Sequence, residues 1–122
     1  MTELIVLVLD DPDKTEEVLT AWLTVGISGV TILDSTGLNY ELGKHGLRDD
    51  LPLFPSLGDL LRGREEPHRT LFSVVPDGFD VEALVAATEN ITGVLDQPDT
   101  GILFVVPVSR VWGLNRRQRP GV

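Results

Sequence analysis

The sequence contains no cysteine and only two histidines. The missing cysteines exclude disulfides, thiolate metal sites and cysteine nucleophiles, and they fit a reducing compartment. His45 and His68 have no partner at a metal-ligand spacing, so we interpret both as solvated loop residues and expect no metal site. The chain also lacks a Walker loop, a dinucleotide-binding glycine pattern and a nucleophile elbow. These absences favour a binding role over catalysis, and no residue is assigned a catalytic role.

Long apolar runs and an N-terminal basic region are missing as well. No apolar run approaches the roughly 18 residues that a membrane-spanning helix needs. Glu3 precedes the first apolar run and no basic residue does, which is not the pattern of a signal peptide. We therefore expect a cytoplasmic protein that does not insert into a membrane.

Cations are scarce compared with anions. The chain has 10 lysines and arginines against 19 aspartates and glutamates, which gives a formal net charge of −9 and a pI near 4.5. Such a protein repels the phosphate backbone, so nucleic acid is not an expected partner. One group of arginines near the C-terminus is the exception, and it indicates either a solvated tail or a contact with an anion or an acidic subunit. Its members are Arg110, Arg116, Arg117 and Arg119.

The apolar pattern predicts alternating strands and helices. Leu4 to Leu9 is apolar on both faces, which is typical of a central strand covered on both sides. Asp11 and Pro12 then suit the start of a helix, and Gly26 suits its end. A second helix is expected from the Asp80 cap to Gly93. Three further strands are expected at Val30–Leu33, Thr70–Val75 and Ile102–Val106.

The resulting order, β-α-β-β-α-β, is the split βαβ pattern. It predicts an α+β fold of ferredoxin-like type, with one antiparallel sheet and two helices on one of its faces. The residues Asp34 to Gly37 are interpreted as the turn that closes the second strand. The length fits a single domain over residues 1–114, followed by a tail at 115–122.

The connection at 38–69 is much longer than a hairpin needs. Its first part, Asn39 to Asp50, is polar, and we expect it to be mobile. Its second part predicts a short helix at Pro55–Leu61, with leucines at helical spacing. Leu51, Leu53 and Phe54 must be buried either on the parent domain or on a partner.

Four segments carry a resemblance to a known family. They are Pro12–Val18, Gly26–Thr31, Val74–Asp77 and Gly101–Val108, in the same order and at near-constant spacing. With them the chain resembles the nitrogen regulatory PII-like proteins. The resemblance implies a homotrimer that associates through its sheets and a small effector, in that family an adenine nucleotide, bound between subunits. It also implies that the long connection is the effector loop (the T-loop) that acts on a target protein.

The resemblance assigns ligand positions residue by residue. Thr31, Gly37 and Val74 fall at nucleobase-contacting positions, and Gly101 falls in a phosphate-binding turn. Thr100 and Arg110 complete the expected ligand-binding set. The family's lysine after that turn is replaced here by Ile102, and its two arginines beyond the last strand by Gly113 and Asn115. Because a triphosphate needs fixed cations, we expect ATP to bind weakly or not at all.

Several assignments stay open at this point. Within the loop, the expected partner-binding residues are Tyr40, Lys44, His45 and Arg48. Asp99 to Gly101 suits either an anion cradle or an ordinary tight turn. A first alternative function is a small enzyme of acylphosphatase type, although Asp10 and Asp11 occupy the turn where it would hold an anion. A second is a metal-binding trimer of the same architecture, with oxygen ligands for a hard cation.

Overall fold

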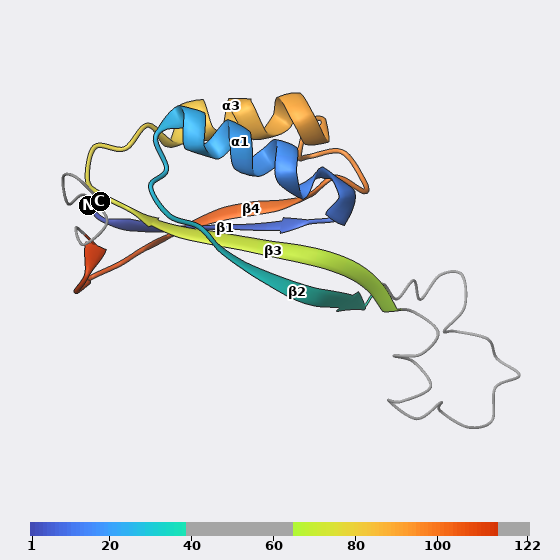
Figure 1. Cartoon of the computed structure of the whole chain (residues 1–122), viewed down its shortest axis with the longest axis horizontal. Coiled ribbons are helices and arrows are strands. Elements are labelled where there is room, and N and C mark those ends of the chain that lie inside the picture. The colour runs from blue at the N-terminus through green and yellow to red at the C-terminus, as the bar shows by residue number, and fades with distance from the viewer. Residues whose placement is uncertain (39–64, 115–122) are drawn as a thin grey trace, which may run out of the picture.

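A computed structural model describes residues 1–38 and 65–114 of the chain (Figure 1). Its strands form one four-stranded sheet in the order β2-β3-β1-β4, and all neighbouring strands are antiparallel. The predicted α+β fold of ferredoxin-like type is confirmed. Along the chain, the elements are β1 (Glu3–Leu9), the 3-10 turn η1 (Pro12–Lys14), α1 (Thr15–Val25), β2 (Thr31–Leu38), β3 (Glu65–Val75), α3 (Val81–Thr92) and β4 (Gly101–Pro107).

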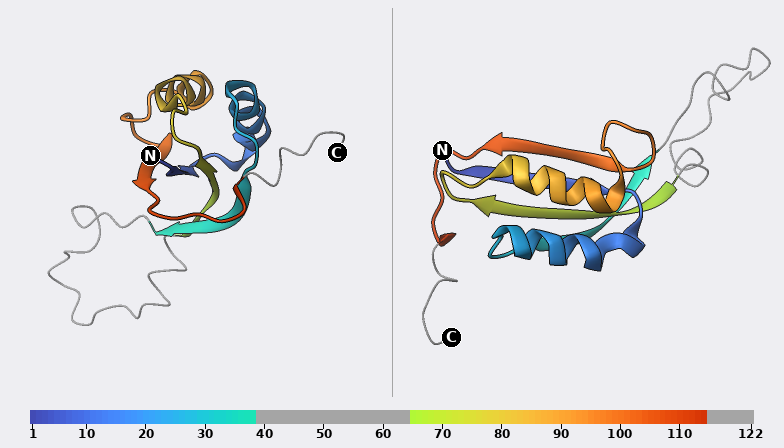
Figure 2. Two further views of the ribbon diagram at one scale, coloured as in Figure 1. Left: turned by 90° about the vertical axis from the view of Figure 1, so that its left-hand side faces the viewer. Right: turned by 90° about the horizontal axis from the view of Figure 1, so that it is seen from above.

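The two helices lie side by side on one face of the sheet (Figure 2). The core forms between them and the odd-numbered residues of β1, since Ile5, Leu7 and Leu9 are fully buried. Trp22 of α1 is also fully buried, and its Nε1 donates a hydrogen bond of 2.9 Å to the Thr88 Oγ1 of α3. This bond satisfies the indole N–H inside the core and fixes the two helices against each other.

The helix ends agree with the predicted caps. The Asp11 side chain accepts a hydrogen bond from the N–H of Asp13, and that of Asp80 from the N–H of Ala83. One 3-10 turn follows Asp11, so the α-helix itself begins at Thr15. Gly26 and Gly93 follow the two helices with φ of 121° and 89°, in the left-handed region that favours glycine.

The hairpin of β2 and β3 is longer than predicted. The expected turn at Asp34–Gly37 is wrong, because these residues continue β2 and pair with β3 as far as Leu38 opposite Glu65. A hydrogen bond of 2.8 Å between the hydroxyls of Ser35 and Thr70 crosses the two strands on one face. On the other face, Arg69 Nε lies 2.9 Å from Asp34 Oδ1, an ion pair whose N–H is not aligned as a hydrogen bond. Cross-strand pairs of this kind let turn-forming residue types remain in an edge strand.

His68 is therefore a strand residue. Its interpretation as a solvated loop residue is wrong, because its side chain is only 16% exposed. The predicted helix at Pro55–Leu61 and the apolar residues before it lie outside the described residues. The same holds for the four predicted partner-binding residues, Tyr40, Lys44, His45 and Arg48. No helix within residues 1–38 and 65–114 is long and apolar enough to cross a membrane.

Candidate functional site

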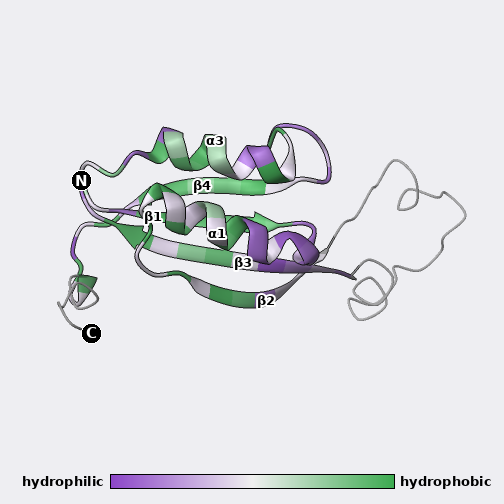
Figure 3. Cartoon of the chain, turned by 45° about the horizontal axis from the view of Figure 1, so that its top comes forward, coloured by the Kyte–Doolittle hydropathy of each residue, from purple (hydrophilic) through white to green (hydrophobic). Residues whose placement is uncertain are grey.

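The sheet face opposite the helices is apolar, and no helix or strand of the described residues covers it. We call it the open face, and it consists of Leu4, Val6, Val8, Phe72, Val74, Ile102, Phe104 and Val106. The strand register places these residues in cross-strand rows such as Phe72–Val6–Phe104. Figure 3 shows β1 and β4 as mainly hydrophobic, and β3 as hydrophobic toward Val75. Within residues 1–38 and 65–114, helices cover β1 on one face only, so the prediction that it is covered on both faces is met by these residues on that face alone.

The β4 residues of the open face have large exposed fractions for apolar side chains, and its other residues are half-buried. Ile102 is 58% exposed, Phe104 43% and Val106 39%. Monomeric proteins rarely expose contiguous apolar patches of this kind, and such patches mark interaction sites. The open face therefore has the character of an interface.

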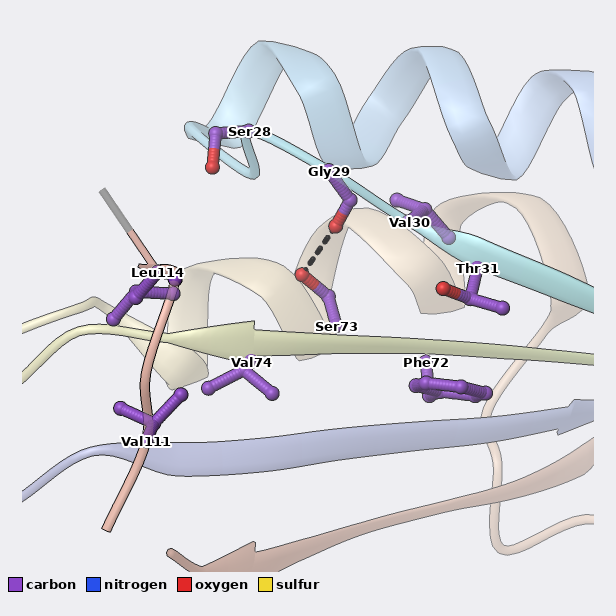
Figure 4. A pocket seen from close by; sticks show the side chains of 10 residues that line it. Ser28, Gly29, Val30, Thr31, Phe72, Ser73, Val74, Val111 and Leu114 are labelled. Atoms are coloured by element: carbon purple, nitrogen blue, oxygen red, sulfur yellow. Dashed lines mark hydrogen bonds between the residues drawn. The ribbon is translucent and has the colours of Figure 1, made fainter. Parts of the chain in front are cut away.

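A groove lies at the edge of β3, where the pairing with β2 begins at Thr31 opposite Phe72 (Figure 4). Beyond this pair the chain before β2 leaves the sheet, and a hydrogen bond of 2.5 Å from the Ser73 hydroxyl to the Gly29 carbonyl holds it beside β3. The groove has a volume of about 190 Å³. It is lined by Ser28, Gly29, Val30, Thr31, Phe72, Ser73, Val74, Val111, Gly113 and Leu114.

Thr31 and Val74, two of the predicted ligand-binding residues, thus line the same groove. Its other wall is the segment after β4, which supplies Val111 and Leu114. Gly113 also lines the groove. The resemblance to PII-like proteins expects a phosphate-binding arginine at this position, and glycine supplies no cation there. Sequence reasoning missed Phe72, Val111 and Leu114. The apolar run at 111–114 inside an otherwise polar end of the chain was the signal available for two of them.

Arg110 does not line the groove. Its guanidinium lies 5.6 Å from the ring centroid of Trp112, in a cation–π arrangement. Trp112 is 81% exposed, so the pair stands on the surface beside the groove rather than inside it.

The remaining predicted ligand residues lie at the other end of the sheet, and each has a structural explanation. A Cβ at Gly37 would collide with the imidazole of His68. A Cβ at Gly101 would lie 2.5 Å from the carbonyl oxygen of Val8, and Gly101 has φ of 134°. The Thr100 hydroxyl contacts the carbonyl oxygens of Gln97 and Leu95 at 2.9 and 3.2 Å, so its hydrogen is used within its own turn.

The same end of the sheet is strongly acidic. We call it the acidic corner, a hollow of about 310 Å³ lined by Asp10, Asp11, Pro12, Glu66, Pro67 and Asp99. The Nε2 atom of His68 lies 3.6 Å from Asp10 Oδ1 and 3.9 Å from Glu66 Oε1. No lysine or arginine of the described residues lines this hollow. Sequence reasoning missed Glu66, because Pro67 and its neighbours resemble loop sequence.

The groove and the acidic corner are far apart within one chain. Val74 pairs with Leu4 of β1, whereas Gly101 pairs with Leu9, five residues along the same strand. At the rise of a β-strand this separation is about 17 Å, and that from Thr31 to Gly37 is about 20 Å. A single ring system is too short to contact both groups in one chain.

The two alternative functions find little support here. An anion cradle after β1 would be built around Asp10 and Asp11, which are carboxylates at the rim of the acidic corner. For a metal, the described residues contain no group of three or more His, Asp or Glu side chains placed to hold an ion.

Comparisons with known proteins support the fold. No model of a protein family matches the chain, and no curated protein does. Among solved structures, the chain is similar to GlnK of B. subtilis, determined as a complex with ATP, at 15% sequence identity. The match covers 88% of this chain and 83% of that chain, with a TM-score of 0.63. The chain therefore has the PII-like fold.

Proposed function

We propose that this chain is a cytoplasmic, non-catalytic regulatory protein of the PII type. Three copies associate through their sheets, and a small effector, for which adenine-containing compounds are the first candidates, binds in the clefts between them. The loop at about 38–68 acts on a partner protein in response. Residues 1–114 form the regulatory domain, and the basic tail at 115–122 follows it.

The observation that carries the proposal is that the candidate site is divided between two ends of the sheet. Thr31 and Val74 lie in the groove, while Gly37 and Gly101 lie about 17–20 Å away at the acidic corner. Association of several copies joins the two ends into one cleft, and it also covers the open face, where Phe104 is 43% exposed. The sequence resemblance to PII-like proteins supplies the number of copies.

The position of the loop fits a regulatory arm. It leaves the domain at Leu38 and returns at Glu65, which are cross-strand neighbours at the tip of the β2–β3 hairpin. Gly37, one of the ligand positions, is the residue before Leu38. An effector bound beside Gly37 would therefore contact the base of the loop, and it could bias the loop between conformations by binding them with different affinities.

The residues present do not fit the triphosphate of ATP. Ile102 and Gly113 stand where the resemblance expects cations, and the charged side chains among the described residues that line the acidic corner are all carboxylates. Only the uncharged part of an adenine-containing effector therefore matches the chemistry of the described residues.

Native mass spectrometry of the purified protein tests the proposal in one measurement. We expect a particle of three 13.3 kDa chains that releases bound small molecules when it is dissociated. A mass corresponding to one chain at micromolar concentration would contradict the assembly and the cleft together. A trimer that never carries a ligand, and that binds none of the adenine compounds named below, would contradict the effector-binding part alone.

A further inference from the structure

We propose that the effector of this protein has no phosphate chain: the groove holds an uncharged planar ring, and the acidic corner excludes polyphosphates. This inference rests on the proposed function, since the groove and the corner meet only when chains associate. It concerns the chemical class of the effector and departs from the ATP complex of the structural neighbour.

The groove has the chemistry of a site for an uncharged ligand. The described residues that line it include no charged side chain. Phe72 and Val74 form one apolar wall, Val111 and Leu114 the other, and Thr31 contributes a hydroxyl. Its volume of about 190 Å³ is smaller than the roughly 300–1,000 Å³ of sites that enclose a drug-sized ligand. The groove therefore accommodates one ring system, with the rest of the ligand directed at the neighbouring subunit.

The far end of the sheet is where the phosphates of a nucleotide would have to lie. Gly101 is the predicted phosphate-turn residue, and Asp99 two residues earlier lines the acidic corner together with Asp10 and Glu66. The Thr100 hydroxyl is already bonded to backbone carbonyls of its own turn. A phosphate placed there would meet the like charges of these carboxylates, which costs binding free energy.

The described cations do not offset these carboxylates. Residues 1–38 and 65–114 contain only three lysines and arginines, namely Lys14, Arg69 and Arg110. Arg69 is paired with Asp34, and Arg110 stacks on Trp112. None of the three lines the acidic corner. The charges that the described residues bring to the acidic corner are therefore negative, and they select against ligands in proportion to the ligands' negative charge.

Calorimetry with adenosine, AMP and ATP tests the inference on the intact trimer. We expect adenosine to bind more tightly than AMP, and ATP with magnesium to bind on the order of tenfold or more weakly than adenosine. Ionic strength gives an independent reading. Raising the salt from about 50 to about 500 mM should strengthen ATP binding, because salt screens repulsion, whereas a cation-lined phosphate site would lose affinity.

Two variants assign the effect to the acidic corner. Glu66→Gln removes one carboxylate, and Asp99→Asn removes another while keeping a residue type that tolerates the left-handed backbone at this position, φ 65°. Each should tighten ATP binding on the order of several-fold, and together on the order of tenfold or more, with adenosine affinity unchanged. Glu82→Gln is the matched control, because it removes the same charge from an exposed site in the first turn of α3 and should change neither affinity.

The outcomes separate this inference from the proposed function. A trimer that binds ATP more tightly than adenosine, or whose ATP affinity falls with salt, would overturn the inference and leave the regulatory proposal standing. A trimer that binds neither compound would also overturn it, as would acidic-corner variants that behave like Glu82→Gln. A monomeric wild-type protein would instead remove the shared cleft, and the proposed function with it.

Discussion

The imidazole of His68 occupies the space that a side chain at Gly37 would need. The two residues lie on adjacent strands near the tip of the β2–β3 hairpin, and the His68 ring also lies within 4 Å of carboxylate oxygens from Asp10 and Glu66. Gly37 is thus a glycine because of its neighbour across the hairpin.

Replacing Gly37 by alanine should therefore destabilise the protein. The methyl group would force the His68 ring out of its position, and overpacking of this kind costs about 1–3 kcal/mol. Urea denaturation at one fixed protein concentration measures the change, since assembly makes stability depend on concentration.

The double variant Gly37→Ala with His68→Ala is the control. Without the His68 ring, the methyl group that Gly37→Ala introduces meets no obstacle. Gly37→Ala should therefore lower the free energy of unfolding much less in the His68→Ala background than in the wild type. An equal cost in both backgrounds would show that Gly37 is needed for its backbone rather than for the ring.

A charge on the open face should prevent assembly. Phe104→Asp places a carboxylate at the β4 end of the apolar row Phe72–Val6–Phe104, where burial between chains would leave it unpaired. We expect sedimentation velocity to show single chains for this variant and trimers for the wild type.

Leu23→Asp is the matched control for the assembly experiment. Leu23 is 57% exposed on α1, in the helical layer on the other side of the sheet, so this variant should remain trimeric. If Leu23→Asp dissociates the protein and Phe104→Asp does not, the helical layer rather than the open face is the interface.

The hydrogen bond between Trp22 and Thr88 should contribute measurably to stability. Thr88→Val keeps the shape but leaves the buried indole N–H without its acceptor, which costs about 1–3 kcal/mol. Thr24→Val removes an exposed hydroxyl that bonds only to the backbone of the same helix, so thermal denaturation should show little change for it. If both variants lower the melting temperature equally, the Thr88 hydroxyl stabilises the protein through its bond to the backbone of α3 rather than through Trp22.

Much of the fold could be predicted because its signals are local. Asp80 caps α3, and Gly26 and Gly93 end the helices, as their positions in the sequence indicate, whereas Asp11 caps the 3-10 turn before α1. The length of β2 could not be predicted in the same way. Asp34, Ser35 and Gly37 are residue types of turns, and the β3 residues that pair with them in the sheet are 29 to 35 residues away in the sequence.

The candidate site was less accessible to prediction. Resemblance identified Thr31, Val74, Gly37 and Gly101 as ligand positions, but it could not show that they form two groups at opposite ends of one chain. The acidic corner is assembled from Asp10, Glu66 and Asp99, which are far apart in sequence. Only the strand register brings such residues together, and a single sequence does not contain that register.

Because Leu38 pairs with Glu65, the β2–β3 hairpin is fully paired up to the two residues that flank the loop. The loop enters and leaves at neighbouring positions, so doubling its length would change the free energy of folding by only about 0.6 kcal/mol. A two-residue Asn-Gly turn between Leu38 and Glu65 could replace it, since that turn suits a tight hairpin. The sequence and the length of the loop can therefore vary in evolution without altering the strand pairing of the sheet.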